Sequence, residues 1–180
     1  MSRTLARPTT APQVRSGRRP AGSPPDGYVD PRGPRFGAAV TTVVLAAVLL
    51  LQAVGDIPAG ILLAVQTLVF AVGTVAGLRR APYGLLFRKL VRPRLAPPPS
   101  FELEALPRFA QGVGLVFAAV GTVGYLLGVT ALGTVATALA LAAAFLNAAF
   151  DFCLGCELNL LLRRALSRPR PQRYVRPAKG

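Results

Sequence analysis

The sequence contains no histidine, no tryptophan and only two cysteines among its 180 residues. Histidine is the commonest general base and metal ligand in proteins, so few groups are left for acid–base catalysis or metal binding. Two cysteines cannot form the disulfide framework of a small secreted domain. Acidic residues are also scarce, with 7 Asp and Glu against 21 Lys and Arg. What needs explaining is a strongly basic chain with little catalytic chemistry.

The basic residues are confined to three blocks, which lie before Phe36, from Arg79 to Arg108, and after Leu162. The two stretches between these blocks contain no Lys or Arg, and each is long enough to cross a bilayer twice. This pattern obeys the positive-inside rule if all three blocks are cytoplasmic. It explains the net charge of +14 without a nucleic acid, so the expected partner is the lipid bilayer and no nucleic-acid partner is expected.

The apolar stretches predict an all-α integral membrane protein with four transmembrane helices, each of about 20 residues. The predicted spans are residues 36–54, 59–78, 109–128 and 133–152. Residues 81–95 alternate apolar and basic side chains, which predicts a short interfacial helix on the cytoplasmic side. Residues 100–102 are interpreted as the start of another helical turn before Pro107.

The composition also predicts the domain organisation. Residues 30–166 form the membrane domain, whereas the Pro- and Arg-rich segments 1–29 and 167–180 are expected to be disordered cytoplasmic tails. The excess of Ala, Arg, Pro and Gly is typical of a GC-rich bacterial genome. We therefore expect a multi-pass protein of a bacterial plasma membrane with both termini in the cytoplasm.

The two halves of the chain resemble each other. Pro34-Arg35-Phe36 recurs as Pro107-Arg108-Phe109, and Leu85-Leu86-Phe87-Arg88 corresponds to Leu160-Leu161-Leu162-Arg163. Because both halves start on the same side, they are predicted to be two parallel-related helical hairpins, with the repeat axis along the membrane normal.

Small residues recur every four positions and predict close helix contacts in lipid. A homo-oligomer built through such contacts is left open. The residues at this spacing are Ala136, Ala140, Ala144 and Ala148, the pair Gly73 and Gly77, and the pair Gly124 and Gly128.

The few polar residues in the spans have structural and functional interpretations. Gln52, Gln66 and Gln111 are predicted to form interhelical hydrogen bonds. Asn147 and Asp151 lie four residues apart, on one face of the fourth helix. Asp151 is expected to pair with an arginine of the basic side: Arg35, Arg79 or Arg108. The alternative is a proton relay in a small transporter-like subunit.

Cys153-Leu154-Gly155-Cys156 is the one constellation that could carry chemistry. Two thiols at this spacing can form a disulfide, carry a persulfide or bind a metal. Metal is the poorest option because the chain offers no further Cys or His ligand, so no metal and no cofactor is expected. Gly155 is expected to break the helix and place Cys156 at a new helix N-terminus, which favours its thiolate, whereas Glu157 opposes it. Cys156 is therefore expected to be the attacking thiol and Cys153 the resolving one. The alternative is two inert, small apolar residues.

Several motifs resemble a family of bacterial membrane proteins called domain of unknown function 4395. The resemblance covers roughly residues 30–166, and its most specific part is the Cys-Leu-Gly-Cys motif. It implies four transmembrane helices, no established activity, and genes often located near those of thioredoxin-like or sulfurtransferase proteins. Asn159 departs from the pattern, which has an aromatic residue there. The motifs that carry the resemblance are residues 30–36, 80–84, 91–95, 107–114 and 152–157.

These observations predict a membrane-anchored thiol- or sulfur-handling protein that uses Cys153 and Cys156 as its working pair. Gly155, Glu157, Asp151 and Asn147 are the candidate supporting residues. A soluble thioredoxin-like or sulfurtransferase (rhodanese-like) protein is the expected partner. The alternatives are a structural membrane subunit with inert cysteines and a small transporter-like subunit.

Overall fold

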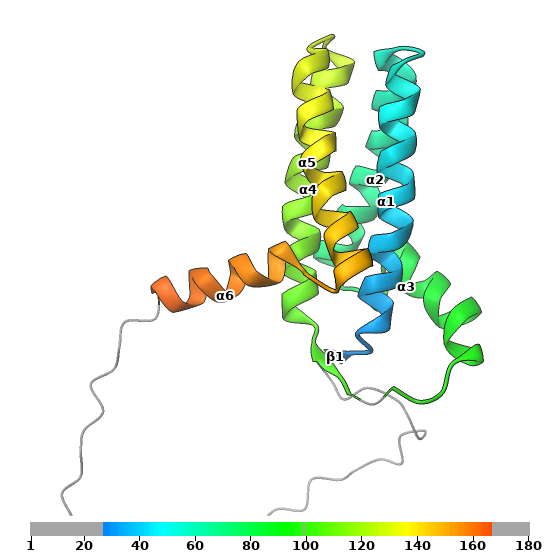
Figure 1. Ribbon diagram of the computed structural model, residues 1–180, viewed down its shortest axis with the longest axis vertical. Helices are drawn as coiled ribbons and strands as arrows, with labels where there is room; N and C mark the ends of the chain where they lie inside the picture. The colour runs from blue at the N-terminus through cyan, green and yellow to red at the C-terminus, as the bar shows by residue number, and fades with distance from the viewer. Residues whose placement is uncertain (1–26, 99, 167–180) are drawn as a thin grey trace, which may run out of the picture.

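The computed structural model describes residues 27–98 and 100–166. Four long helices stand side by side in one bundle (Figure 1). Each is long and apolar enough to cross a membrane, which confirms the predicted all-α architecture of four transmembrane helices. The helices begin three or four residues earlier than the sequence predicted. They are α1 (Arg32–Gln52), α2 (Asp56–Val75), α4 (Ala105–Leu126) and α5 (Thr130–Phe150).

The helices form two hairpins, α1–α2 and α4–α5, whose short connections lie at the same end of the bundle (Figure 1). We call this the turn end. Gly128 in the second connection has a φ of 72°, which glycine adopts without steric cost. The Thr130 hydroxyl donates a hydrogen bond to the Asp56 carboxylate, so the first residues of α5 and α2 are joined there. The opposite end carries Arg35, Arg79 and Arg108, and we call it the basic end.

Each hairpin packs against the other as well as within itself. Helix α1 packs on α5 and α2 packs on α4, and both hairpins start at the basic end. This arrangement confirms two parallel-related hairpins.

Arg35 and Arg108, which occupy equivalent positions in the repeat, bind equivalent targets in the opposite hairpin. Arg35 Nε donates to the Ala148 carbonyl of α5 at 3.1 Å, and Arg108 Nε donates to the Thr74 carbonyl of α2 at 2.6 Å. The last carbonyls of a helix lack backbone partners and carry partial negative charge, so each arginine stabilises a helix end and joins the two hairpins.

The centre of the bundle combines apolar packing with a few paired polar groups. Leu45, Leu63 and Tyr125 are fully buried there. Gln66 is also buried; its Nε2 donates to Thr41 Oγ1 on α1 at 3.5 Å, and its Oε1 accepts the Tyr83 hydroxyl at 2.6 Å. The predicted interhelical hydrogen bond of Gln66 is therefore confirmed.

The same prediction is wrong for the other two glutamines. Within the described residues, Gln52 and Gln111 form no interhelical hydrogen bond. Gln52 is the last residue of α1, beside the turn, and the Gln111 side chain lies flat against Gly73 of α2.

The small residues mark close helix contacts at some of the predicted positions. A Cβ added at Gly124 would lie 2.7 Å from the Gly133 nitrogen, and one at Gly73 would lie 2.8 Å from Gln111 Oε1. Gly77 and Gly128, however, lie beyond the ends of α2 and α4 with φ of 83° and 72°, so they end helices and do not form helix faces.

On α5 the alanine stripe is only partly a packing face. Ala136 and Ala140 are buried, whereas Ala144 and Ala148 are half-buried. The tight contact is therefore restricted to the half of α5 nearer the turn end.

The segment between the hairpins is helical, as predicted for residues 81–95. It comprises α3 (Pro82–Leu86), a π-helical turn (Phe87–Val91) and a 3₁₀ turn (Arg92–Arg94). It projects from the basic end on the side opposite to the last helix of the chain (Figure 1).

A short strand pair at the basic end corrects one prediction. β1 (Tyr28–Val29) pairs antiparallel with β2 (Glu102–Leu103), so the turn expected at residues 100–102 is not helical. Tyr28 and Val29, which the sequence analysis assigned to the N-terminal tail, form a strand. The Glu104 nitrogen continues this pairing by donating to the Gly27 carbonyl at 2.9 Å. The two strands are distant in sequence, so local patterns do not reveal their pairing. Residues 1–26 and 167–180 lie outside the described residues.

Candidate dithiol site

The corner that presents the two cysteines is made by Asp151. Helix α5 ends at Phe150, and Asp151 has the left-handed conformation, with a φ of 58°. Aspartate tolerates this region better than most residues. The helix therefore breaks at Asp151 and not at Gly155, which corrects the sequence-based expectation. Asn147 is half-buried on α5, whereas Asp151 is exposed and lies beyond the last residue of that helix. The two side chains therefore do not share one helix face.

The predicted ion pair of Asp151 is not formed. Within the described residues, Arg35 and Arg108 donate to backbone carbonyls at helix ends, and Arg79 Nη2 donates to the Tyr28 carbonyl. Partial burial and, to a smaller extent, the charge of Asp151 raise the pKa of Glu102 on β2. Among the described side chains, Asp151 therefore lies near the Glu102 carboxylate and forms no ion pair with these three arginines.

Cys153 caps the next helix, α6 (Leu154–Leu166). Its carbonyl accepts the Glu157 N–H at 3.0 Å, and its Sγ accepts the Cys156 N–H at 3.3 Å. A side chain that accepts the third N–H of a helix in this way satisfies one of the donors that the first turn leaves unpaired. Cys153 is therefore the N-cap residue of α6, whereas the sequence analysis expected the helix N-terminus at Cys156.

The Sγ atoms of Cys153 and Cys156 are joined in a disulfide, with the two Cα atoms 5.1 Å apart. This Cα separation is within the usual range for a disulfide. Both cysteines are half-buried, so the pair is partly accessible at the basic end. Glu157 is exposed in the first turn of α6. The chain thus brings the two thiols together as expected.

Gly155 allows α6 to dock on α4. It is buried, and a Cβ added to it would lie 2.6 Å from both Cα and Cβ of Ala110. Real Cβ atoms do not approach a backbone so closely, so only glycine fits here. The sequence analysis missed Ala110, since a lone alanine in an alanine-rich chain carries no signal.

Helix α6 extends sideways from the bundle (Figure 1). Its sequence gives it an apolar face. Leu154, Leu158 and Leu161 are exposed. At about 100° per residue, Cys156 is roughly 140–160° around the helix from all three. A helix of this kind lies in the membrane interface with its apolar face in the lipid. Cys156 is then on the opposite side of α6 from these three leucines.

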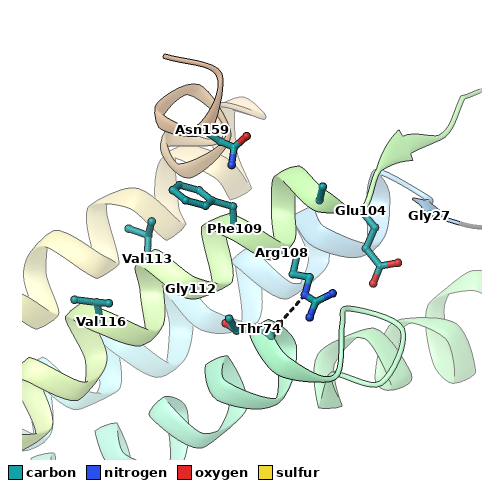
Figure 2. A pocket seen from close by; sticks show the side chains of 10 residues that line it. Gly27, Thr74, Glu104, Arg108, Phe109, Gly112, Val113, Val116 and Asn159 are labelled. Carbon is teal, nitrogen blue, oxygen red and sulfur yellow. Dashed lines mark hydrogen bonds between the residues drawn. The ribbon is translucent and has the colours of Figure 1, made fainter. Parts of the chain in front are cut away.

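A cavity of about 740 Å³ lies beside the dithiol site, between α2, α4 and α6. Asn159, one turn after Cys156 on α6, lines it together with Phe109 and Val113 of α4 (Figure 2). Glu104 and Arg108 lie at its polar end. Within residues 27–98 and 100–166, no group of three or more His, Cys, Asp or Glu side chains could hold a metal ion.

The fold and this site define a multi-pass membrane protein with four apolar helices and a paired CxxC at the start of a surface helix. Residues 29–164 match the family described as Domain of unknown function (DUF4395). The match spans most of the chain, which therefore belongs to this family, as its motifs indicated. The chain matches no curated protein and no solved structure.

Proposed function

We propose that the protein is a membrane-anchored dithiol that exchanges disulfides with a soluble thioredoxin-like or sulfurtransferase partner. One observation carries the proposal: Cys153 and Cys156 form a disulfide at the first turn of a helix, and the Cys156 N–H donates to Cys153 Sγ. Dithiols in the first turn of a helix are suited to exchange because the helix end favours a thiolate.

Cys153 is the attacking residue in this proposal. As a thiolate it would keep the Cys156 N–H as a donor and would face the positive end of the α6 dipole. This assignment replaces the expectation that Cys156 attacks, since that expectation rested on a helix break at Gly155. Glu157 in the same turn reduces the effect but lies further along the helix.

The exchange balances without a further oxidant. The Cys153 thiolate, whose proton has gone to solvent, attacks one sulfur of the partner's disulfide, forms a mixed disulfide and releases a partner thiolate, which takes up a proton. Cys156 loses its proton to solvent and attacks Cys153 Sγ, which releases the second partner thiolate, and this takes up a proton. The partner gains two electrons and two protons, and the protein returns to the Cys153–Cys156 disulfide.

The test is mass spectrometry of the peptide containing both cysteines, taken from cells whose thiols were trapped with an alkylating agent. We expect a mixture of disulfide and alkylated dithiol that shifts toward the dithiol when the cells are reduced. A persulfide on Cys153 would assign the same thiol to sulfur transfer. Complete alkylation of both thiols under every condition would contradict the proposal.

The basic end is proposed to face the cytoplasm, because Arg35, Arg79 and Arg108 lie there and the positive-inside rule places such residues on the cytoplasmic side. In a variant whose native cysteines are replaced by serine, Val54→Cys at the turn end should react with a membrane-impermeant maleimide in intact cells. Arg92→Cys should react only after the cells are opened. The reverse pattern would place the dithiol on the outer side and exclude a cytoplasmic partner.

A further inference from the structure

We propose that the cavity between α2, α4 and α6 binds a zwitterionic phospholipid of the phosphatidylethanolamine type. The cavity has a charged end and an apolar end. Glu104 and Arg108 lie at the basic end of α4, whereas Val113 and Val116 follow on the membrane-spanning part of the same helix (Figure 2). Val116 is 62% exposed on the outside of the bundle, so the cavity opens toward the lipid.

The length of the cavity fits one phospholipid in one leaflet. Glu104 and Val116 are twelve positions apart on α4, which corresponds to about 18 Å at 1.5 Å per residue. One leaflet provides about half of the roughly 30 Å hydrocarbon core, and the headgroup lies beyond it. An acyl chain along Val113 and Val116 therefore places the headgroup at Arg108 and Glu104.

The two charged residues point to a headgroup that carries both signs. Arg108 uses Nε and Nη2 on the Thr74 and Val75 carbonyls, and its Nη1 has no partner among the described residues. Glu104 accepts the Leu78 N–H with Oε1. These residues form no ion pair with each other, although they are four apart on the chain. Arg108 can thus bind the phosphate and Glu104 the ammonium group.

Two substitutions distinguish the contact with the acyl chain of the lipid from the contact with its charged headgroup. Gly112→Leu should fill the cavity without moving the helices, because a Cβ at Gly112 would meet only Thr74 Cγ2, at 3.6 Å. Glu104→Gln keeps an oxygen acceptor for the Leu78 N–H and removes the charge. Arg35→Gln is the control for the loss of one charge at the basic end, since Arg35 binds the end of α5 and lies outside this cavity.

The experiment is native mass spectrometry of the full-length protein released from bilayers of equal phosphatidylethanolamine and phosphatidylglycerol. The parent and Arg35→Gln should retain phosphatidylethanolamine in preference, and Gly112→Leu should retain about tenfold less, since its side chain occupies the space of the acyl chain. Glu104→Gln should bind both lipids equally. Equal retention by the parent, unchanged retention by Gly112→Leu, or a bound amphiphile without phosphate, such as a quinone, would overturn the proposal.

Discussion

Cys153→Ser should react with oxidised glutathione about tenfold more slowly than Cys156→Ser does, when both are measured as single-thiol variants in nanodiscs. The Cys153 thiolate would accept the Cys156 N–H at the start of α6, whereas a thiolate on Cys156 has no such N-cap bond. A charge-assisted hydrogen bond of this kind corresponds to roughly that factor in the thiolate population. The measurement is the rate of glutathione adduct formation by intact-protein mass spectrometry.

The products should differ as well as the rates. Cys156→Ser should keep glutathione on Cys153 as a stable mixed disulfide, because no second thiol is present to release it. The parent protein should lose the adduct and return to the Cys153–Cys156 disulfide. Equal rates for the two single variants would remove the N-cap argument, and a faster Cys156 would restore the assignment made from the sequence.

Gly155→Ala should displace α6 from α4 and slow the exchange of the parent dithiol. The added Cβ would lie 2.6 Å from Cα of Ala110, and a backbone atom can move only with its whole helix. Alanine favours a helix over glycine by about 1 kcal/mol, whereas overpacking costs about 1–3 kcal/mol, so the clash should dominate. Hydrogen exchange of the α6 amides should become faster.

Gly37→Ala on α1 is the control for this substitution. Its Cβ would meet only Tyr83 Cβ, at 3.7 Å, which is an ordinary contact. Gly37→Ala brings the same gain in helix propensity without a clash. The hydrogen-exchange protection of the α6 amides and the rate of thiol exchange should therefore be unchanged or slightly higher. If Gly155→Ala behaves like Gly37→Ala, Gly155 does not position the dithiol.

The four spans were predictable because hydrophobic length and charge distribution act locally along the chain. A helix in lipid satisfies its own backbone groups, so about 20 apolar residues are sufficient to define one. The predicted first residues of α1 and α4 were a few positions late, since both helices begin within segments that contain arginine and proline. The Pro-Arg-Phe repeat also predicted the equivalence of the hairpins, but not that Arg35 and Arg108 each bind the opposite hairpin.

The candidate site was predictable only in part. The sequence singled out Cys153 and Cys156, and their spacing placed them within reach of a disulfide. It placed the helix break at Gly155, because glycine is the usual signal for an end, whereas the chain turns at Asp151 in a left-handed conformation. Whether a glycine breaks a helix or allows close packing depends on the neighbouring helix, here Ala110 of α4.

The sequence by itself determined that this is a four-span membrane protein of the DUF4395 family with one pair of thiols. These properties follow from the hydrophobicity, charge and spacing of side chains along the chain, so they do not depend on the tertiary structure. Only the tertiary structure decided that Cys153 caps α6, that Gly155 touches α4 and that Glu104 and Arg108 share a cavity. The contact of Gly155 and the cavity depend on the packing of helices that are distant in sequence, which local patterns do not encode. The cap depends on the chain turning at Asp151 in a left-handed conformation, which the glycine signal at Gly155 concealed.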